Sequence, residues 1–194
     1  HKGKVLAAIQ AHSDDMPFHY AGTVAKLMKE GYTGYLIRTS NDEKTGPGTV
    51  GDSVLNNEQD NRTLGKVMGF KKTYDLYYRN HRMDGISMVE MRARLIFLFR
   101  LLKVDTVVTM DPWGHYDANP DHVMTSKAVE GACWMAGMSK DFPEHFDTGL
   151  EPHSVQEKYY INRGPQLVNR IVDISSVIDV KVEALRTCVQ QGGG

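Results

Sequence analysis

The sequence has little of what marks a disulfide-bonded, a membrane-spanning or a nucleic-acid-binding protein. Its two cysteines, Cys133 and Cys188, lie in apolar helical segments without CxxC spacing, so we expect buried free thiols. The longest apolar run, residues 95–102, is far shorter than the roughly 20 residues of a membrane span. The 23 basic and 24 acidic residues give a net charge of −1, which provides no basic field for nucleic acid. We therefore expect no nucleic-acid partner and no transmembrane segment. The sequence assigns no compartment, and the cytoplasm is favoured.

A length of 194 residues indicates one domain, which we assign to residues 1–194. A chain of this size buries about 70% of its unfolded surface, so it needs no structural metal as a staple. The first residue is His1 rather than Met, and the chain stops at QQGGG, which is typical of a piece trimmed at both ends.

Short apolar runs alternate with segments of helical periodicity. This alternation predicts an α/β fold, a Rossmann-like, doubly wound and mostly parallel sheet with helices on both faces. The predicted strands cover residues 4–10, 33–40, 72–78 and 104–110, and the predicted helices cover about 19–30, 52–68, 88–102 and 120–136. The pattern weakens after that, where we expect strands at 157–163 and 170–174 and a closing helix at 175–190.

Polar side chains gather where the first and fourth of these strands end. His12, Asp14 and Asp15 follow the first strand directly, and His122 comes from the loop after the fourth. Ligands of such folds bind beyond the carboxyl ends of the strands. Two imidazoles and one carboxylate form the three-ligand set of a catalytic zinc site, in which a neighbouring carboxylate takes a proton from the attacking water.

Each of these residues also has a purely structural interpretation. His12 alone is compatible with a hydrogen-bonded core histidine, and Asp14 or Asp15 with a cap of the following helix. The combination of HxDD at one strand end with PDH at a later one favours the metal site over coincidence.

These motifs carry a family resemblance. The chain resembles the LmbE/PIG-L family of metal-dependent N-deacetylases, whose loops typically read AHPDDE and HPDH, where this chain has AHSDDM and NPDH. The likeness extends over about residues 4–136, through the segments GTVAKLMKEGYTGYLIRTSNDE, NEQDNR and PDHVMTSKAVEGA. It implies a Rossmann-like fold and hydrolysis of the acyl amide of an N-acylated amino sugar or a related amide. It also implies the metal ligands His12, Asp15 and His122, with Asp14 as general base. Zinc is the expected cofactor, and Fe(II) suits the same ligands.

The chain departs from the family pattern at three positions. Ser13 replaces a proline and Met16 a glutamate. Asn119 stands where the family has a histidine that stabilises the oxyanion or protonates the leaving amine. An asparagine donates a hydrogen bond but cannot act as an acid, and Asn119 is equally suited to cap the helix that begins at Pro120. His115, in the same loop, is the alternative source of an imidazole.

Other polar residues are weaker candidates. Asp121 either orients a metal-bound imidazole or favours the positive end of a helix dipole. Asn57 and Arg62 are candidate substrate contacts or polar surface residues of a helix. The cluster Arg79, His81, Arg82 and Asp84 either lines a sugar site or forms a solvated loop. The first loop contains no glycine, which argues against a nicotinamide cofactor.

Two rival functions share these features. One is a non-catalytic carbohydrate- or metabolite-binding domain that keeps the metal site, an interpretation that Asn119 and Met16 favour. The other is a hydrolase of an ester or of a non-sugar amide. An intact Asp14 favours hydrolysis over binding alone, because a carboxylate beside the metal is costly to bury when no proton is moved.

Overall fold

The computed structural model describes residues 2–114, 117–162 and 168–192. Within them lies a five-stranded sheet of order β3-β2-β1-β4-β5, in which every neighbouring pair is parallel. The strands are β1 (Val5–Gln10), β2 (Thr33–Ser40), β3 (Lys72–Tyr78), β4 (Thr106–Met110) and β5 (Glu157–Ile161). The predicted α/β fold with a parallel sheet is confirmed.

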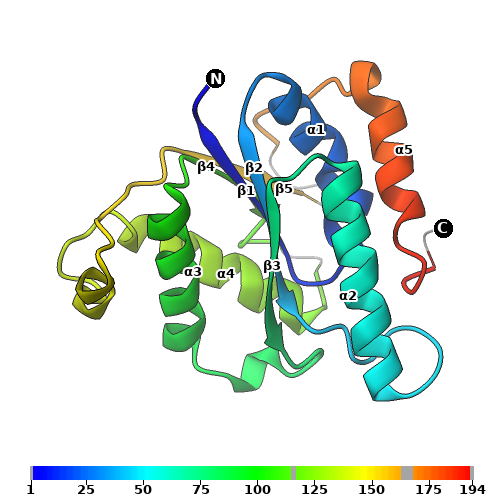
Figure 1. Ribbon diagram of the computed structural model, residues 1–194, viewed down its shortest axis with the longest axis horizontal. Helices are drawn as coiled ribbons and strands as arrows, with labels where there is room; N and C mark the ends of the chain where they lie inside the picture. Colours follow the sequence, from blue (N-terminus) through cyan, green and yellow to red (C-terminus); the bar gives the residue numbers. More distant parts are fainter. Residues whose placement is uncertain (1, 115–116, 163–167, 193–194) are drawn as a thin grey trace.

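Helices cover both faces of this sheet, as Figure 1 shows. On one face lie α3 (Met88–Leu102) and α4 (Pro120–Met135). On the other lie α1 (Ala21–Lys29), α2 (Val50–Val67) and α5 (Ile178–Arg186). None of the helices in the described part of the chain combines the length and the apolar character needed to cross a membrane.

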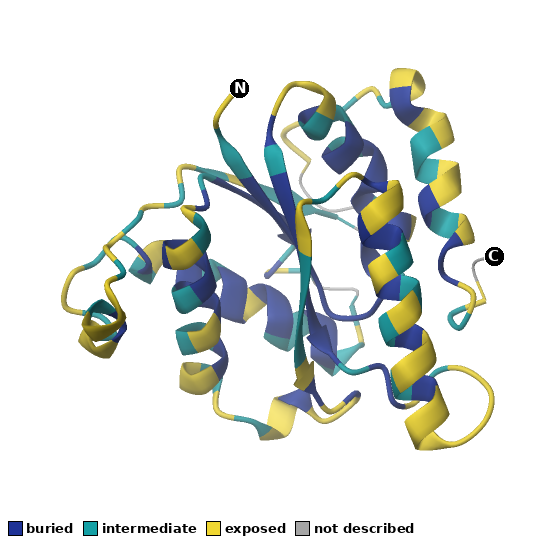
Figure 2. Ribbon diagram, viewed as in Figure 1, coloured by how far each residue is buried: buried dark blue, intermediate teal, exposed yellow. Residues whose placement is uncertain are grey.

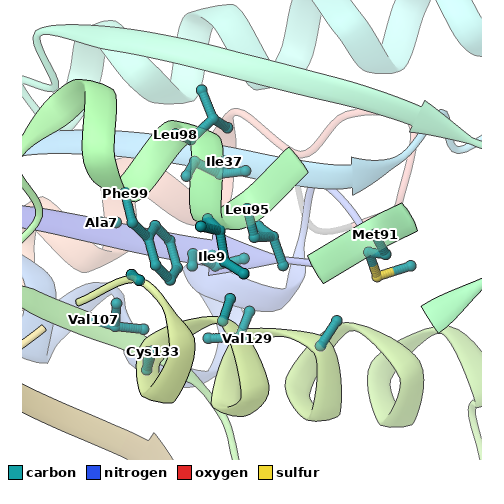
Figure 3. Close-up of a cluster of buried hydrophobic side chains, with 14 of the residues drawn as sticks. Ala7, Ile9, Ile37, Met91, Leu95, Leu98, Phe99, Val107, Val129 and Cys133 are labelled. Carbon is teal, nitrogen blue, oxygen red and sulfur yellow. The ribbon is translucent and has the colours of Figure 1, made fainter. Parts of the chain in front are cut away.

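The central strand β1 explains why the first apolar run is almost continuous. Successive side chains of a strand point to opposite faces, so both faces of a covered strand must be apolar. Ala7 and Ile9 pack into the cluster under α3 and α4, whereas Leu6 and Ala8 pack into the cluster under α1 and α2. Figure 2 shows the buried strands between the more exposed helices, and Figure 3 shows Ile9 among side chains of α3 and α4. The loop that follows β1 is therefore anchored from both faces.

The segment after β5 differs from the prediction. Residues 170–174 form no strand, and the closing helix is α5, preceded by a 3₁₀ turn at Ser175–Val177. The segment lies across α1 instead, where the Lys26 Nζ donates to the Asp173 carbonyl at 2.8 Å. A Cβ at Gly22 would lie 2.6 Å from the Ile174 side chain, so the glycine permits this close approach. Ile174 serves this packing on α1 rather than sheet pairing, whereas Ile171 is exposed.

Two smaller predictions are confirmed. Cys133 and Cys188 are buried free thiols. The helix predicted for residues 19–30 is present as α1, preceded by one π-helical turn at Met16–Tyr20.

Candidate metal centre

The two polar loops meet at the carboxyl edge of the sheet. β1 pairs with β2 on one side and with β4 on the other, so the chain order reverses between β1 and β4. Such a switch point leaves a crevice beyond the strand ends. His12 and Asp15 enter it from the loop after β1, and His122 enters it from the first turn of α4.

Three side chains, His12, Asp15 and His122, form what we call the donor group, because their donor atoms converge. The His12 Nδ1 lies 3.0 Å from the His122 Nε2, and the His122 Nε2 lies 2.9 Å from the Asp15 Oδ1. The His12 Nδ1 lies 3.7 Å from the other Asp15 oxygen. A tetrahedral zinc ion at about 2.0 to 2.2 Å from its ligands separates their donor atoms by about 3.3 to 3.6 Å. Two of the three separations are a few tenths of an ångström shorter than this and the third is slightly longer. The residues present therefore suit zinc in chemistry, and small shifts would let them share one ion.

All three members of the donor group are buried. Burial opposes charge on His12, but the Asp15 carboxylate and Asp121 outweigh it and raise the imidazole pKa well above its ordinary value. Burial likewise acts against the Asp15 charge, yet His12 and His122 hold its pKa well below the usual range. The Asp15 carboxylate of the donor group thus remains negative, and it stabilises positive charge at the position where a cation would bind.

Each imidazole is oriented by a second carboxylate through its other nitrogen. The His12 Nε2 lies 3.1 Å from the Asp121 Oδ2. The His122 Nδ1 lies 2.9 and 3.1 Å from the two oxygens of Asp117. A carboxylate behind a metal-binding imidazole fixes the tautomer and the ring plane. The orienting contact expected of Asp121 is present. Asp117 was not among the predicted site residues, and its only signal in the sequence is its place in the same loop as His122.

Asp15 also shapes its own loop. Its Oδ2 accepts hydrogen bonds from the backbone N–H groups of Ala11 and His12, at 2.9 and 2.8 Å. The neighbouring Ser13 N–H donates to the Asp42 Oδ2 at 3.0 Å, and Asp42 forms a buried ion pair with Arg38 of β2 at 2.7 Å. Backbone and charge together hold the loop where His12 can reach the crevice.

Asp14 lies beside the donor group and is partly buried. Burial, together with the negative charge of Asp15, raises the pKa of its carboxyl to about 6. A general base is most effective when its pKa lies near the working pH. The environment therefore suits Asp14 for accepting a proton near neutrality.

Asn119 caps α4. Its Oδ1 accepts a hydrogen bond from the Asp121 N–H at 3.0 Å, and Pro120 occupies the first turn. The capping interpretation is confirmed, and a role of the amide nitrogen toward an oxyanion stays a prediction. His115, the other candidate for this role, lies outside the described residues.

Asn57 was expected as a candidate substrate contact or as a polar surface residue of a helix, and the structure places it in the interior instead. The residue is fully buried, its Oδ1 accepts from the Ser13 Oγ at 3.1 Å, and its Nδ2 donates to the Thr45 and Ser53 carbonyls. This side chain joins α2 to the loops after β1 and β2. It has a structural role because its position on α2 faces inward, which an isolated polar letter in a helix does not reveal.

The remaining candidates divide between surface and pocket. Arg62 is exposed and pairs with Glu58 one turn earlier on α2, which supports its surface interpretation. Arg79 and Asp84 line an open pocket of about 730 Å³ after β3, together with His81. Arg79 also pairs with Glu43 at 3.0 Å.

The fold is a doubly wound parallel sheet, and its carboxyl edge carries a buried His-Asp-His donor group with a carboxyl beside it. These features place the chain among α/β proteins with a candidate catalytic metal centre. Within that class, residues 7–133 match the family model described as "PIG-L: GlcNAc-PI de-N-acetylase". The chain belongs to the PIG-L family.

Two deacetylases and one hydratase are among the proteins to which this chain is similar. Diacetylchitobiose deacetylase of Thermococcus kodakarensis is 29% identical over 188 residues, which cover 95% of this chain and 68% of that protein. Among solved structures, N,N'-diacetylchitobiose deacetylase from Pyrococcus horikoshii, complexed with its inhibitor MPG, superposes with a TM-score of 0.86 at 24% identity, covering 97% of this chain and 70% of that one. The 4-carboxy-2-hydroxymuconate hydratase GalB from Pseudomonas putida has the same fold, with a TM-score of 0.78 at 17% identity over 97% of this chain and 80% of that one.

Proposed function

We propose that this protein is a metal-dependent N-deacetylase that hydrolyses the N-acetyl amide of an amino sugar. The observation that carries the proposal is the convergence of His12, Asp15 and His122 on one point with Asp14 beside them. Membership of the PIG-L family and the likeness to a diacetylchitobiose deacetylase support the reaction and the substrate class.

The donor group would hold zinc, and Fe(II) would suit the same atoms. When bound, such an ion supplies a Lewis acid for the amide carbonyl and lowers the pKa of the attacking water. Zinc is the first candidate because two imidazoles and one carboxylate, with a position left for water, are a common ligand set of catalytic zinc sites.

The side chains of the chain itself then perform the proton transfers. Asp14 takes a proton from the attacking water, and its protonated carboxyl returns that proton to the nitrogen as the amine leaves. The Nδ2 of Asn119 donates a hydrogen bond to the oxyanion while its Oδ1 caps α4. Asp121 and Asp117 hold the two imidazoles in the required orientation.

The experiment that tests the proposal measures metal content and amine release together. Wild type and His12→Ala are purified without chelator, and free amine is measured after incubation with diacetylchitobiose and with N-acetylglucosamine. We expect about one zinc or iron per chain and amine release in the wild type, and neither in the variant. Metal binding without any amine release from these sugars would indicate the binding-domain alternative instead. Release of acid from a simple ester, or of amine from a non-sugar amide, with no amine released from either sugar would indicate the other rival.

A further inference from the structure

One imidazole beside the donor group is not a member of it. His81 follows β3, and its ring lies edge-on to the His12 ring, with 6.2 Å between the centroids and an angle of 74° between the planes. A ring nitrogen of His81 also lies within 4.8 Å of a ring nitrogen of His12 and of a carboxylate oxygen of Asp121. His81 is exposed, whereas the donor group is buried, so His81 is an imidazole accessible to solvent next to that group.

The contacts of Asp121 argue against a second metal ion at these residues. Its Oδ2 accepts from the Asn80 Nδ2, the His81 N–H and the His12 Nε2, at 3.1, 2.7 and 3.1 Å. Its Oδ1 accepts from the Met83 N–H at 3.3 Å. A cation bound by His12, His81 and Asp121 would have to displace several of these bonds. The imidazole of His81 is therefore better placed to contact a substrate than to bind metal.

The backbone holds His81 in a conformation that side chains rarely adopt. Its φ is +58°, in the left-handed region, which is unfavourable for a residue with a Cβ. The short bond from its N–H to Asp121 offsets this cost and ties its position to the same carboxylate that orients His12. Strained residues of this kind persist where the surrounding structure fixes them, and they concentrate at functional sites.

His81 also belongs to the wall of the open pocket after β3. The other residues of the wall include Tyr77, Arg79, Arg82 and Asp84. A wall that combines aromatic residues with several hydrogen-bonding residues is suited to a sugar ring with its hydroxyls. His81 is thus the residue that touches both this pocket and the metal centre.

We propose that His81 contacts the substrate directly, with its imidazole hydrogen-bonded to the N-acyl amino sugar whose sugar ring occupies the pocket after β3. The assignment rests on the proposed function. Asn119 is engaged in capping α4. His81 would then supply an imidazole to the substrate from a different loop.

The test compares His81→Ala and His81→Gln with the wild type. His153→Ala is the matched control, because His153 pairs with Asp105 beside the start of β1, at the opposite edge of the sheet. Zinc content, binding of N-acetylglucosamine and diacetylchitobiose by calorimetry with and without zinc, and kcat and KM for amine release are measured for each protein.

We expect His81→Ala to keep its zinc, to bind both sugars about 10- to 100-fold more weakly and to lose a similar factor in kcat/KM. His81→Gln, which keeps a donor, should recover part of the binding, and His153→Ala should resemble the wild type. Wild-type sugar affinity in His81→Ala would overturn the proposal, as would a loss of zinc comparable to that of His12→Ala or an absence of sugar binding by the wild type. Because binding is measured apart from turnover, a protein that binds sugar through His81 but releases no amine would contradict the proposed function alone.

Discussion

At the scale of single residues, the site depends on carboxylates that each perform two tasks. Asp15 folds its loop with one oxygen and faces His122 with the other. Asp121 orients His12 while holding the backbone of the loop after β3. A substitution of Asp15 or Asp121 would therefore change the geometry and the charge of the site together. Substitutions of neighbouring residues separate the two effects.

The first prediction concerns Asp14. Replacing it with asparagine keeps the size of the side chain but removes the base, so turnover of an N-acetyl sugar should fall by about 10² to 10⁴. The donor group is untouched, and the zinc content should remain that of the wild type. Amine release and elemental analysis on the same preparation check this. Undiminished turnover in Asp14→Asn would remove Asp14 from the mechanism.

The second prediction concerns Asp117. Asp117→Ala frees the His122 ring from its orienting carboxylate, and zinc should then bind about 10- to 100-fold more weakly. Competition against a chromophoric zinc chelator measures the affinity. Asp147→Ala serves as control, because Asp147 is an exposed residue of the 3₁₀ segment Pro143–Thr148. Equal zinc affinity in the two variants would show that Asp117 does not orient the ligand.

At the scale of elements, α2 anchors the loop that carries His12. Asn57 joins this helix to Ser13, and Gln191 near the chain end donates to the same Asn57 Oδ1 at 3.0 Å. Asn61, one turn later, bonds Gln10 of β1 at 3.0 Å and Asp75 of β3 at 3.0 Å. The inward face of α2 thus carries polar side chains that form hydrogen bonds at these two positions. The inward face of an ordinary sheet-covering helix is apolar.

The third prediction follows from this polar face. Asn57→Ala leaves several buried groups without their partner and should lower the free energy of unfolding by about 1 to 3 kcal/mol. Gln59→Ala, on the exposed side of the same helix, should change it by less than about 0.5 kcal/mol. Urea denaturation followed by circular dichroism measures both. Matching midpoints for the two variants would contradict the anchoring role.

Particular residues show how far the sequence could predict this site. The donor group was identifiable because polar residues directly after buried parallel strands must converge at one sheet edge. Asp117 was missed, because an orienting contact depends on the path of the loop between β4 and α4. Asn57 was misassigned, since polarity alone does not say which face of a helix is buried. Residues 170–174 are rich in β-branched side chains, which favours a strand, but tertiary contacts with α1 decide their conformation instead.

At the scale of the whole molecule, the candidate metal centre joins segments that lie far apart in the chain. His12 and Asp15 follow β1, and His122 begins α4 after β4, so a bound ion would link segments about 110 residues apart in the chain. A ligand that binds only the folded state stabilises it by mass action.

The fourth prediction is therefore thermal. Zinc at about 100 times its dissociation constant should add about 2.7 kcal/mol to the free energy of unfolding. For a protein of this size this corresponds to a rise in Tm of roughly 5 to 11 °C. Scanning calorimetry of chelator-treated protein, with and without added zinc, measures the rise. His12→Ala should show almost none, and an equal rise in that variant would place the stabilising ion elsewhere.

The burial of both cysteines has a practical consequence. Burial raises the pKa of each thiol to about 12, so neither Cys133 nor Cys188 presents a thiolate at neutral pH. A maleimide dye would leave the native wild-type chain largely unlabelled. A cysteine introduced at the exposed position Gln59 would then be the one site that carries the dye. Single-site fluorescence experiments on this protein therefore do not require Cys133 and Cys188 to be replaced first.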